Sequence, residues 1–166
     1  MKNLNKISII IVIFLGGCQY DPYTWEYTKK QPRQAALVGT YFPNQETVSY
    51  ITQEGHYPVR ESSIFLAENG SCSINSIPDW WLTSGDSKSG FDSGECVWKL
   101  EKHQEWWSVA VVFNSTAQFS SQQFRPGSYG VSFMLLGEKP PYKIHLIVGD
   151  PDEGKGMTFE KVSVLK

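Results

Sequence analysis

The residues best suited to chemistry in this 166-residue chain are three cysteines, three histidines and two pairs of adjacent tryptophans. The histidines, His56, His103 and His145, stand in separate segments. No Ser-His-Asp order, metal-ligand spacing or phosphate-binding glycine loop accompanies them. We therefore expect no catalytic residues, no metal ligands and no cofactor.

The N-terminus combines features of a secretory signal. Lys2 and Lys6 supply positive charge, and the apolar run from Ile7 to Leu15 is followed by Gly16-Gly17 and then Cys18. That order is typical of a signal peptide. A membrane-spanning helix needs roughly 20 apolar residues, and this run has nine. We therefore predict that residues 1–17 are a signal peptide.

The sequence Leu15-Gly16-Gly17-Cys18 also resembles the lipobox of bacterial lipoproteins. The resemblance implies that the Cys18 thiol carries a diacylglycerol and becomes the first residue of the mature protein. Gln19 is similar to the outer-membrane sorting pattern of Gram-negative lipoproteins. The resemblance therefore implies a fatty-acylated protein at the outer membrane, facing the periplasm or the cell surface.

Charge excludes some partners. The chain has 15 basic and 17 acidic side chains, and the basic Lys2 and Lys6 belong to the signal peptide. The mature chain is thus mildly acidic and has no long basic run, so no nucleic-acid partner is expected. Such a chain is not an electrostatic membrane binder, and membrane contact is expected through the lipid at Cys18.

Two cysteines remain, Cys72 and Cys96. Because the envelope is oxidising, a disulfide between them is the first expectation. The alternatives are two free thiols or a metal pair, although a metal pair would want further Cys or His residues close by. Cys72 and Cys96 alternate with polar neighbours on two predicted strands, and adjacent strands would bring their apolar faces together.

Hydrophobic alternation with a period of two runs through most of the chain after Ala36. The strands it predicts are 37–42, 64–67, 72–77, 95–101, 106–113, 129–136, 142–148 and 157–162, with 48–53 as a doubtful one. No amphipathic helix of useful length is expected. The sequence predicts an all-β fold: one antiparallel meander β-barrel of about eight strands over residues 36–166, on a tether of residues 18–35. The tether is rich in tyrosine and tryptophan, so part of it is expected to lie against the domain or near the lipid headgroups.

Three features resemble the lipocalin-type barrel: Gly39-Thr40-Tyr41 on the first strand, the Asn69-Gly70 hairpin, and Gly94 followed by Trp98. Tyr41 stands where that family usually has tryptophan, and Lys161 is the residue closest in place to its arginine. The segment from Gly149 to Gly154, with Phe159-Glu160-Lys161 behind it, resembles a group of uncharacterised bacterial lipoproteins. Both resemblances imply a fold and a location, without an activity.

The tryptophan pairs are Trp80-Trp81 and Trp106-Trp107. Neighbouring residues on a strand point to opposite faces, so Trp107 continues an inward row and Trp106 lies on the other face. Exposed aromatic side chains often mark a ligand or partner site. We predict Trp80, Trp81 and Trp106 as ligand-binding residues at the mouth of a cavity. The alternative is that they cap the barrel end and flank its rim.

The segment Asp150-Pro151-Asp152-Glu153-Gly154 has the acidic spacing with which a calcium loop begins. It lacks the later ligands that would complete the shell. A hairpin loop containing Pro and Gly between the last two strands is the favoured interpretation.

Two functions follow as hypotheses. The first is a lipid-anchored envelope protein without catalysis, which binds a small apolar ligand or a protein partner through its open end and the loop from Thr83 to Gly94. The second is an inhibitor or immunity protein that acts on a toxin or hydrolase in the periplasm. A lined void in the barrel would favour ligand binding, and a barrel filled by large side chains would favour the interaction protein.

Overall fold

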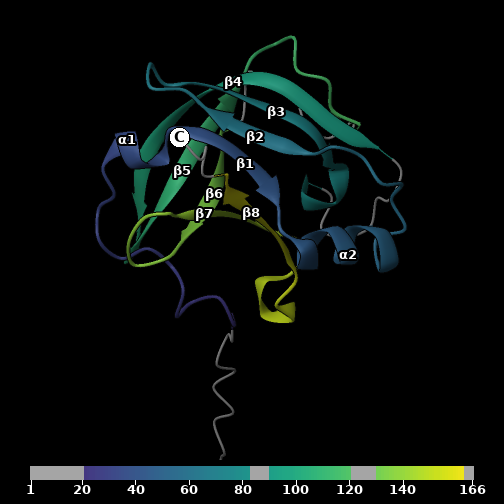
Figure 1. Cartoon of the computed structure of the whole chain (residues 1–166), viewed down its shortest axis with the longest axis horizontal. Helices are drawn as coiled ribbons and strands as arrows, with labels where there is room; N and C mark the ends of the chain where they lie inside the picture. Colours follow the sequence, from purple (N-terminus) through teal and green to yellow (C-terminus); the bar gives the residue numbers. More distant parts are fainter. Residues whose placement is uncertain (1–20, 83–89, 121–129, 163–166) are drawn as a thin grey trace, which may run out of the picture.

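The chain forms a closed barrel of eight antiparallel strands, each paired with its neighbour in sequence (Figure 1). The structure is a computed structural model that describes residues 21–82, 90–120 and 130–162. The strands are β1 (Gly39–Pro43), β2 (Ser63–Leu66), β3 (Ser71–Pro78), β4 (Phe91–His103), β5 (Trp106–Phe113), β6 (Gly130–Leu136), β7 (Lys143–Ile147) and β8 (Gly156–Lys161). β8 pairs with β1, which closes the sheet on itself. The predicted all-β meander barrel is confirmed.

Short helical elements lie at the ends of the barrel. They are α1 (Gln34–Leu37), α2 (Gln45–Gln53) and the 3-10 turns η1 (Asp79–Leu82) and η2 (Pro151–Glu153). Among the described residues, no helix has the length and apolar character that crossing a bilayer would require.

The barrel interior is filled by large side chains. Every strand contributes inward residues to one continuous core, in which Tyr41, Phe113, Phe133 and Phe159 are among the largest fully buried side chains. The alternation seen in the sequence determines this arrangement, because successive residues of a strand point to opposite faces. The interior is therefore a packed core.

The disulfide between Cys72 and Cys96 is confirmed. The two residues are direct partners in the register of β3 and β4, and their Cα atoms lie 4.8 Å apart. Both side chains are 2% exposed and belong to the interior core. The bond therefore links two adjacent strands from inside the barrel.

One end of the barrel is closed by the residues that resemble the lipocalin signature. Leu37 of α1 and Tyr41 of β1 are fully buried, and the Tyr41 hydroxyl donates a hydrogen bond to the Leu37 carbonyl at 2.7 Å. Gly39 has a φ of 144° and leaves room for the Lys161 chain, which a Cβ would meet at 2.7 Å. The Lys161 ammonium donates to the Ala36 carbonyl at 3.1 Å. Lys161 thus fastens α1 across this end.

The prediction for residues 48–53 was wrong, because this segment belongs to helix α2 rather than to a strand. Asn44 caps the helix: its side chain accepts a hydrogen bond from the Thr47 backbone N–H at 2.8 Å. Thr47 and Ile51 are the buried positions, and their four-residue spacing places both on one helix face. The expectation of no amphipathic helix is also corrected. A helix cap and tertiary burial outweighed the β-branched composition of the segment.

The described part of the predicted tether packs against the barrel. Residues 21–28, here called the strap, meet the strands where β5 begins and β6 ends. The Thr28 N–H donates to the Leu135 carbonyl at 2.9 Å, and the Trp107 N–H donates to the Thr28 carbonyl at 2.8 Å. Tyr27 is 3% exposed and packs with Trp106, Met134 and Leu136. The strap therefore covers an apolar patch on the outside of the barrel.

Candidate functional site

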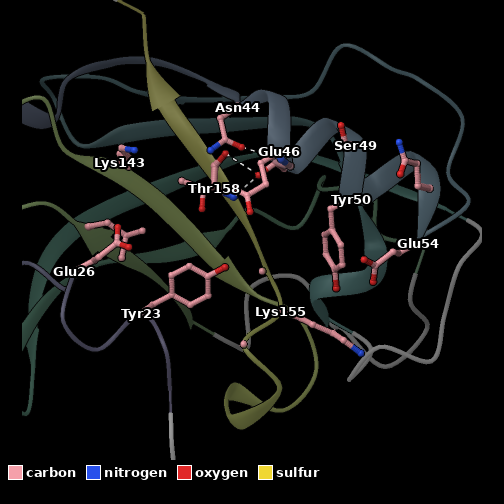
Figure 2. A pocket seen from close by; sticks show the side chains of 15 residues that line it. Tyr23, Glu26, Asn44, Glu46, Ser49, Tyr50, Glu54, Lys143, Lys155 and Thr158 are labelled. Atoms are coloured by element: carbon pink, nitrogen blue, oxygen red, sulfur yellow. Dashed lines mark hydrogen bonds between the residues drawn. The ribbon is translucent and has the colours of Figure 1, made fainter.

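A groove of about 650 Å³ lies on the outside of the barrel. The strap, α2, the loop that follows η2, and strands β7 and β8 all contribute residues to it. Figure 2 shows Tyr23 of the strap on one side of the groove and Tyr50, with Glu46 and Glu54, on the α2 side. The volume falls within the usual range for small-molecule sites.

Helix α2 turns its polar face to the groove. The groove is lined by Glu46, Thr47, Ser49, Tyr50 and Gln53 of the helix and by its C-cap residue Glu54. Spacings of three and four residues place the polar side chains on one helix face, whereas Ile51 belongs to the buried core. The helix is thus amphipathic, with its apolar face on the barrel and its polar face on the groove.

Each of the two groove tyrosines rests on a buried ring. The Tyr50 ring stacks on Trp80, with centroids 4.6 Å apart and an interplanar angle of 15°. The Tyr23 ring lies 4.0 Å from the ring of His145. Trp80 is 6% exposed and His145 is fully buried. The tyrosines are therefore held by packing before any ligand arrives.

The side chains that line the groove carry an excess of negative charge. Glu26, Glu46 and Glu54 line it, and none of the three has an ion-pair partner in the part of the chain that the structure describes. The two lysines of the lining are already paired: Lys143 with Glu160 at 2.8 Å and Lys155 with Glu153 at 3.0 Å.

Burial and the nearby acidic charges raise the pKa of both groove tyrosines. Burial, followed by the charges of Glu54 and Glu153, raises the pKa of Tyr50 to about 12. Burial and the charges of Glu46 and Glu26 also raise the pKa of Tyr23 above its ordinary value. Both hydroxyls therefore stay protonated at neutral pH and keep a proton to donate.

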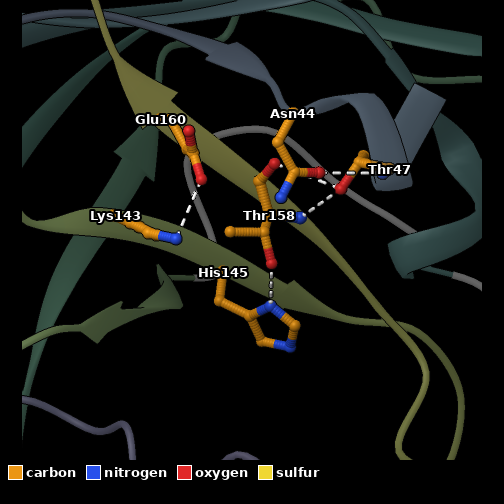
Figure 3. Close-up of polar contacts among 6 residues, drawn as sticks. All are labelled: Asn44, Thr47, Lys143, His145, Thr158 and Glu160. Carbon is orange, nitrogen blue, oxygen red and sulfur yellow. Dashed lines mark hydrogen bonds and ion pairs between the residues drawn. The ribbon is translucent and has the colours of Figure 1, made fainter.

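A chain of polar contacts runs from α2 to a histidine beneath the groove (Figure 3). The Thr47 hydroxyl accepts from the Thr158 N–H at 2.8 Å, and the Thr158 hydroxyl lies 2.9 Å from His145 Nδ1. His145 Nε2 is buried and has no hydrogen-bond partner among the described residues. Gly156 makes room for the ring, since a Cβ there would lie 2.3 Å from Nε2.

The contact between Thr158 and His145 joins a hydroxyl to a base, but its ionisation does not suit catalysis. Burial lowers the pKa of His145 to about 4, and the Asp21 charge opposes this shift. A general base works best with a pKa near the operating pH. We therefore interpret the pair as a structural contact that holds β7, β8 and α2 together.

A second polar centre is buried near η1, at the end of the barrel where β3 ends and β4 begins. The Tyr57 hydroxyl donates to Asp79 at 2.5 Å, and the Ser120 hydroxyl lies 2.7 Å from Asp79 and 3.1 Å from Asp92. Burial raises the pKa of Asp92 to about 6, although hydrogen bonds from Ser120 lower it in part. This network fixes η1 against β4.

The structure separates the three tryptophans that the sequence grouped as ligand-binding residues. Trp80 lies in the core and supports Tyr50. Trp81 lines a cleft of about 230 Å³ with Val131, Phe133, Leu146 and Ile147. Trp106, at the other end of the barrel, packs on Tyr27 with ring centroids 5.2 Å apart.

The acidic segment after β7 forms a capped turn. The Asp150 side chain accepts from the Asp152 N–H at 3.0 Å, and Gly154 takes the left-handed conformation with φ 63°. Within residues 21–82, 90–120 and 130–162, no three His, Cys, Asp or Glu side chains are placed to hold a metal ion.

Other sequence predictions lie outside the described residues. These are the signal peptide, the lipidation site Cys18 and residues 83–89 of the predicted binding loop.

Sequence reasoning missed the groove. Its acids and tyrosines come from the strap and α2, which are separated in the sequence by α1 and β1. One signal was available: with Asn44 read as a helix cap, Glu46, Tyr50 and Glu54 share one face at intervals of four residues. Nothing in the sequence around His145 indicates that the Tyr23 ring covers it.

Comparisons of this chain with protein-family models, with curated proteins and with solved structures found no match.

Proposed function

We propose that this chain is a lipid-anchored protein of the bacterial outer membrane that binds a protein partner without catalysing a reaction. The barrel serves as a rigid scaffold, and the groove between the strap and α2 is the binding site. Inhibition of, or immunity against, a toxin or hydrolase in the periplasm is the specific form of this function that we consider. The N-terminal signal and Cys18 support the anchor.

The observation that carries this proposal is that the barrel interior is filled by side chains, whereas the groove on its outer surface is open. Large aromatic side chains such as Phe113, Phe133 and Phe159 occupy the interior, which leaves little room for a ligand of lipocalin type. The groove has polar walls, two packed tyrosines and three glutamates that have no ion-pair partner among the described residues. Protein interfaces favour tyrosine as an anchor, since it supplies contact area at low entropic cost.

The anchor is tested by labelling cells with radioactive palmitate. The wild-type protein should carry the label and fractionate with membranes, whereas Cys18→Ser should lose both properties. An unlabelled, soluble wild-type product would overturn the anchor.

The binding site is tested with a photo-crosslinking residue placed at Gln53, which lines the groove. The matched control carries it at Glu68, an exposed position on the hairpin between β2 and β3. We expect a crosslinked product of one discrete mass from the Gln53 position only, lost when Glu46 and Glu54 are both changed to Gln. Equal products from both positions would contradict a partner site in the groove.

One observation favours a second candidate, the binding of a small apolar ligand. The Trp81 cleft is lined mostly by apolar side chains, in keeping with the sequence-based prediction for Trp81. Beside it, β6 and β7 pair only over Met134–Leu136 and Lys143–His145. At about 230 Å³ the cleft is smaller than typical ligand sites, which exceed about 300 Å³. Titration with fatty acids should quench tryptophan fluorescence in the wild type and not in Trp81→Phe; an identical response in both would exclude this cleft.

A further inference from the structure

We propose that the groove recognises a guanidinium or ammonium group, presented by a basic segment of a protein partner. The choice of a protein as the source of the cation rests on the function proposed above. The chemistry of recognition rests on the groove alone.

The first argument is charge. Glu26 comes from the strap, and Glu46 and Glu54 come from α2 and its C-cap, so negative charge lies on both sides of the groove. Lys143 and Lys155 are paired with glutamates and do not neutralise these three acids. An anionic ligand, including a phosphate headgroup, would be repelled by these carboxylates, whereas a cation would be attracted to them.

The second argument is the pair of aromatic rings. Tyr23 and Tyr50 stand on opposite sides of the groove (Figure 2), and their rings are backed by His145 and Trp80 at 4.0 Å and 4.6 Å. Cations bind over the faces of tyrosine rings, and arginine also stacks on them. Fixed tyrosines next to carboxylates are the combination that suits an organic cation better than a metal ion, which would want more oxygen ligands.

The third argument is an unused hydrogen-bonding group in the groove wall. The Tyr50 hydroxyl oxygen is buried and has no partner among the described residues. Buried polar atoms are rarely left unpaired in native proteins. Guanidinium and ammonium groups carry several N–H donors and no acceptor, so they would supply the bond that this oxygen lacks.

The fully buried side chain of His145, beneath the groove, is also compatible with a bound cation. His145 is 0% exposed, and its Nε2 has no partner among the described residues. Tyr23, Gly156 and Thr158, which line the groove, lie against this ring. With its pKa lowered to about 4, the ring is neutral at pH 7 and adds no positive charge that would repel a cation.

The test is calorimetric binding at pH 7 with the full-length product purified from membranes in detergent. The probe is the blocked peptide Gly-Arg-Gly-Arg-Gly, and the matched peptide replaces each arginine with citrulline, which keeps the shape and loses the charge. Free arginine amide distinguishes a small cation from a peptide. We expect the arginine peptide to bind, the citrulline peptide to bind at least tenfold more weakly, and arginine amide to bind more weakly than the peptide.

Two double variants locate the site. Glu46→Gln with Glu54→Gln should weaken peptide binding at least tenfold. Glu61→Gln with Glu68→Gln makes the same change in net charge at exposed positions outside the groove and should change binding less than twofold. Tyr50→Phe keeps the ring and should weaken binding less than Tyr50→Leu.

Three results would overturn the inference: no binding of the arginine peptide, equal binding of the citrulline peptide, or equal losses in the two double variants. Arginine amide that binds as tightly as the peptide would overturn the protein source. Palmitate labelling is independent of all these measurements, so a failure of the cation site and a failure of the anchor are distinguishable.

Discussion

The inside and the outside of this barrel bury side chains in different ways. Inside, the eight strands close on one another, and residues such as Phe133 and Leu135 are buried by the same sheet that carries them. Outside, Met134, Leu136 and His145 are buried because the strap lies over them. Burial inside the barrel thus follows from the strand pattern, whereas burial outside it depends on a segment more than one hundred positions away in the sequence.

The largest effect is expected inside the barrel. Phe133→Ala removes a side chain that is 1% exposed and lies against Trp81, with ring centroids 5.6 Å apart. The free energy of unfolding should fall by about 3–5 kcal/mol, because the variant leaves a cavity in a packed core. Urea denaturation measures the change, with Phe65→Ala, a 43% exposed position on β2, as the control that should shift little. A loss below 1 kcal/mol would mean that the interior is loosely packed.

Removing the disulfide changes the stability of the interior mainly by changing the unfolded chain. Replacing both Cys72 and Cys96 by Ala opens a link between residues 24 positions apart. The unfolded chain then gains conformational freedom, and stability should fall by about 3 kcal/mol on the chain-entropy account. Thermal unfolding of the variant should match that of the reduced wild type. A wild-type protein whose unfolding is insensitive to reductant would contradict this prediction.

A pH titration tests the outer layer. The folded pKa of His145 is about 4, and the unfolded value is about 6.5. At a pH between these two values, His145 is protonated in the unfolded chain and neutral in the folded chain. The contribution of neutral His145 to the free energy of unfolding is fully present above about pH 6.5 and is lost as the pH falls toward 4. It amounts to about 3 kcal/mol. Urea denaturation at several pH values should show this loss in the wild type and a smaller loss in His145→Gln.

The contribution of Asp92 to stability changes with pH in the opposite direction to that of His145, which separates the interior group from the outer one. Its folded pKa of about 6 lies above its ordinary value, so its contribution is present at low pH and is lost as the pH rises through 6. Asp92→Asn removes this term. Its stability should then fall more steeply than that of the wild type on acidification; an unchanged profile would contradict the raised pKa.

The smallest effect is expected in the strap itself. Tyr27→Phe removes the hydrogen bond from the Tyr27 hydroxyl to Asp21 at 2.5 Å and keeps the ring against Trp106. Global stability should fall by about 1 kcal/mol. Hydrogen exchange should quicken at the Thr28 amide, which is bonded to Leu135, and remain unchanged at amides of β3 and β4. Equal changes throughout the barrel would mean that the strap and the barrel unfold as one unit.

The fold was predictable because one rule applied almost everywhere. Period-two alternation located all eight strands, and the predicted range 106–113 coincides with β5. The cysteine pairing was expected from the oxidising envelope, and the same rule placed Cys72 and Cys96 on the apolar faces of their strands. The rule failed at residues 48–53, where the residues of the segment favour a strand and the Asn44 cap decides for a helix.

The candidate site was not predictable, for a related reason. Tryptophan pairs stand out in a sequence, but Trp80 proved to be the support for Tyr50 and Trp106 an outer packing residue. The groove acids, by contrast, look like ordinary surface charges along the chain. Their proximity depends on how α2 and the strap dock on β7 and β8, and alternation within a strand carries no information about that docking.

If Cys18 carries a lipid, as we propose, the docking of the strap limits how far the protein can reach from the membrane. With a lipid on Cys18, only Gln19 and Tyr20 separate the anchored residue from Asp21, whose carbonyl already accepts a hydrogen bond from the Thr24 N–H. Three peptide steps extend at most about 11 Å. The domain would therefore sit almost directly on the bilayer with little freedom to swing, and only a target that comes to the membrane surface could meet it.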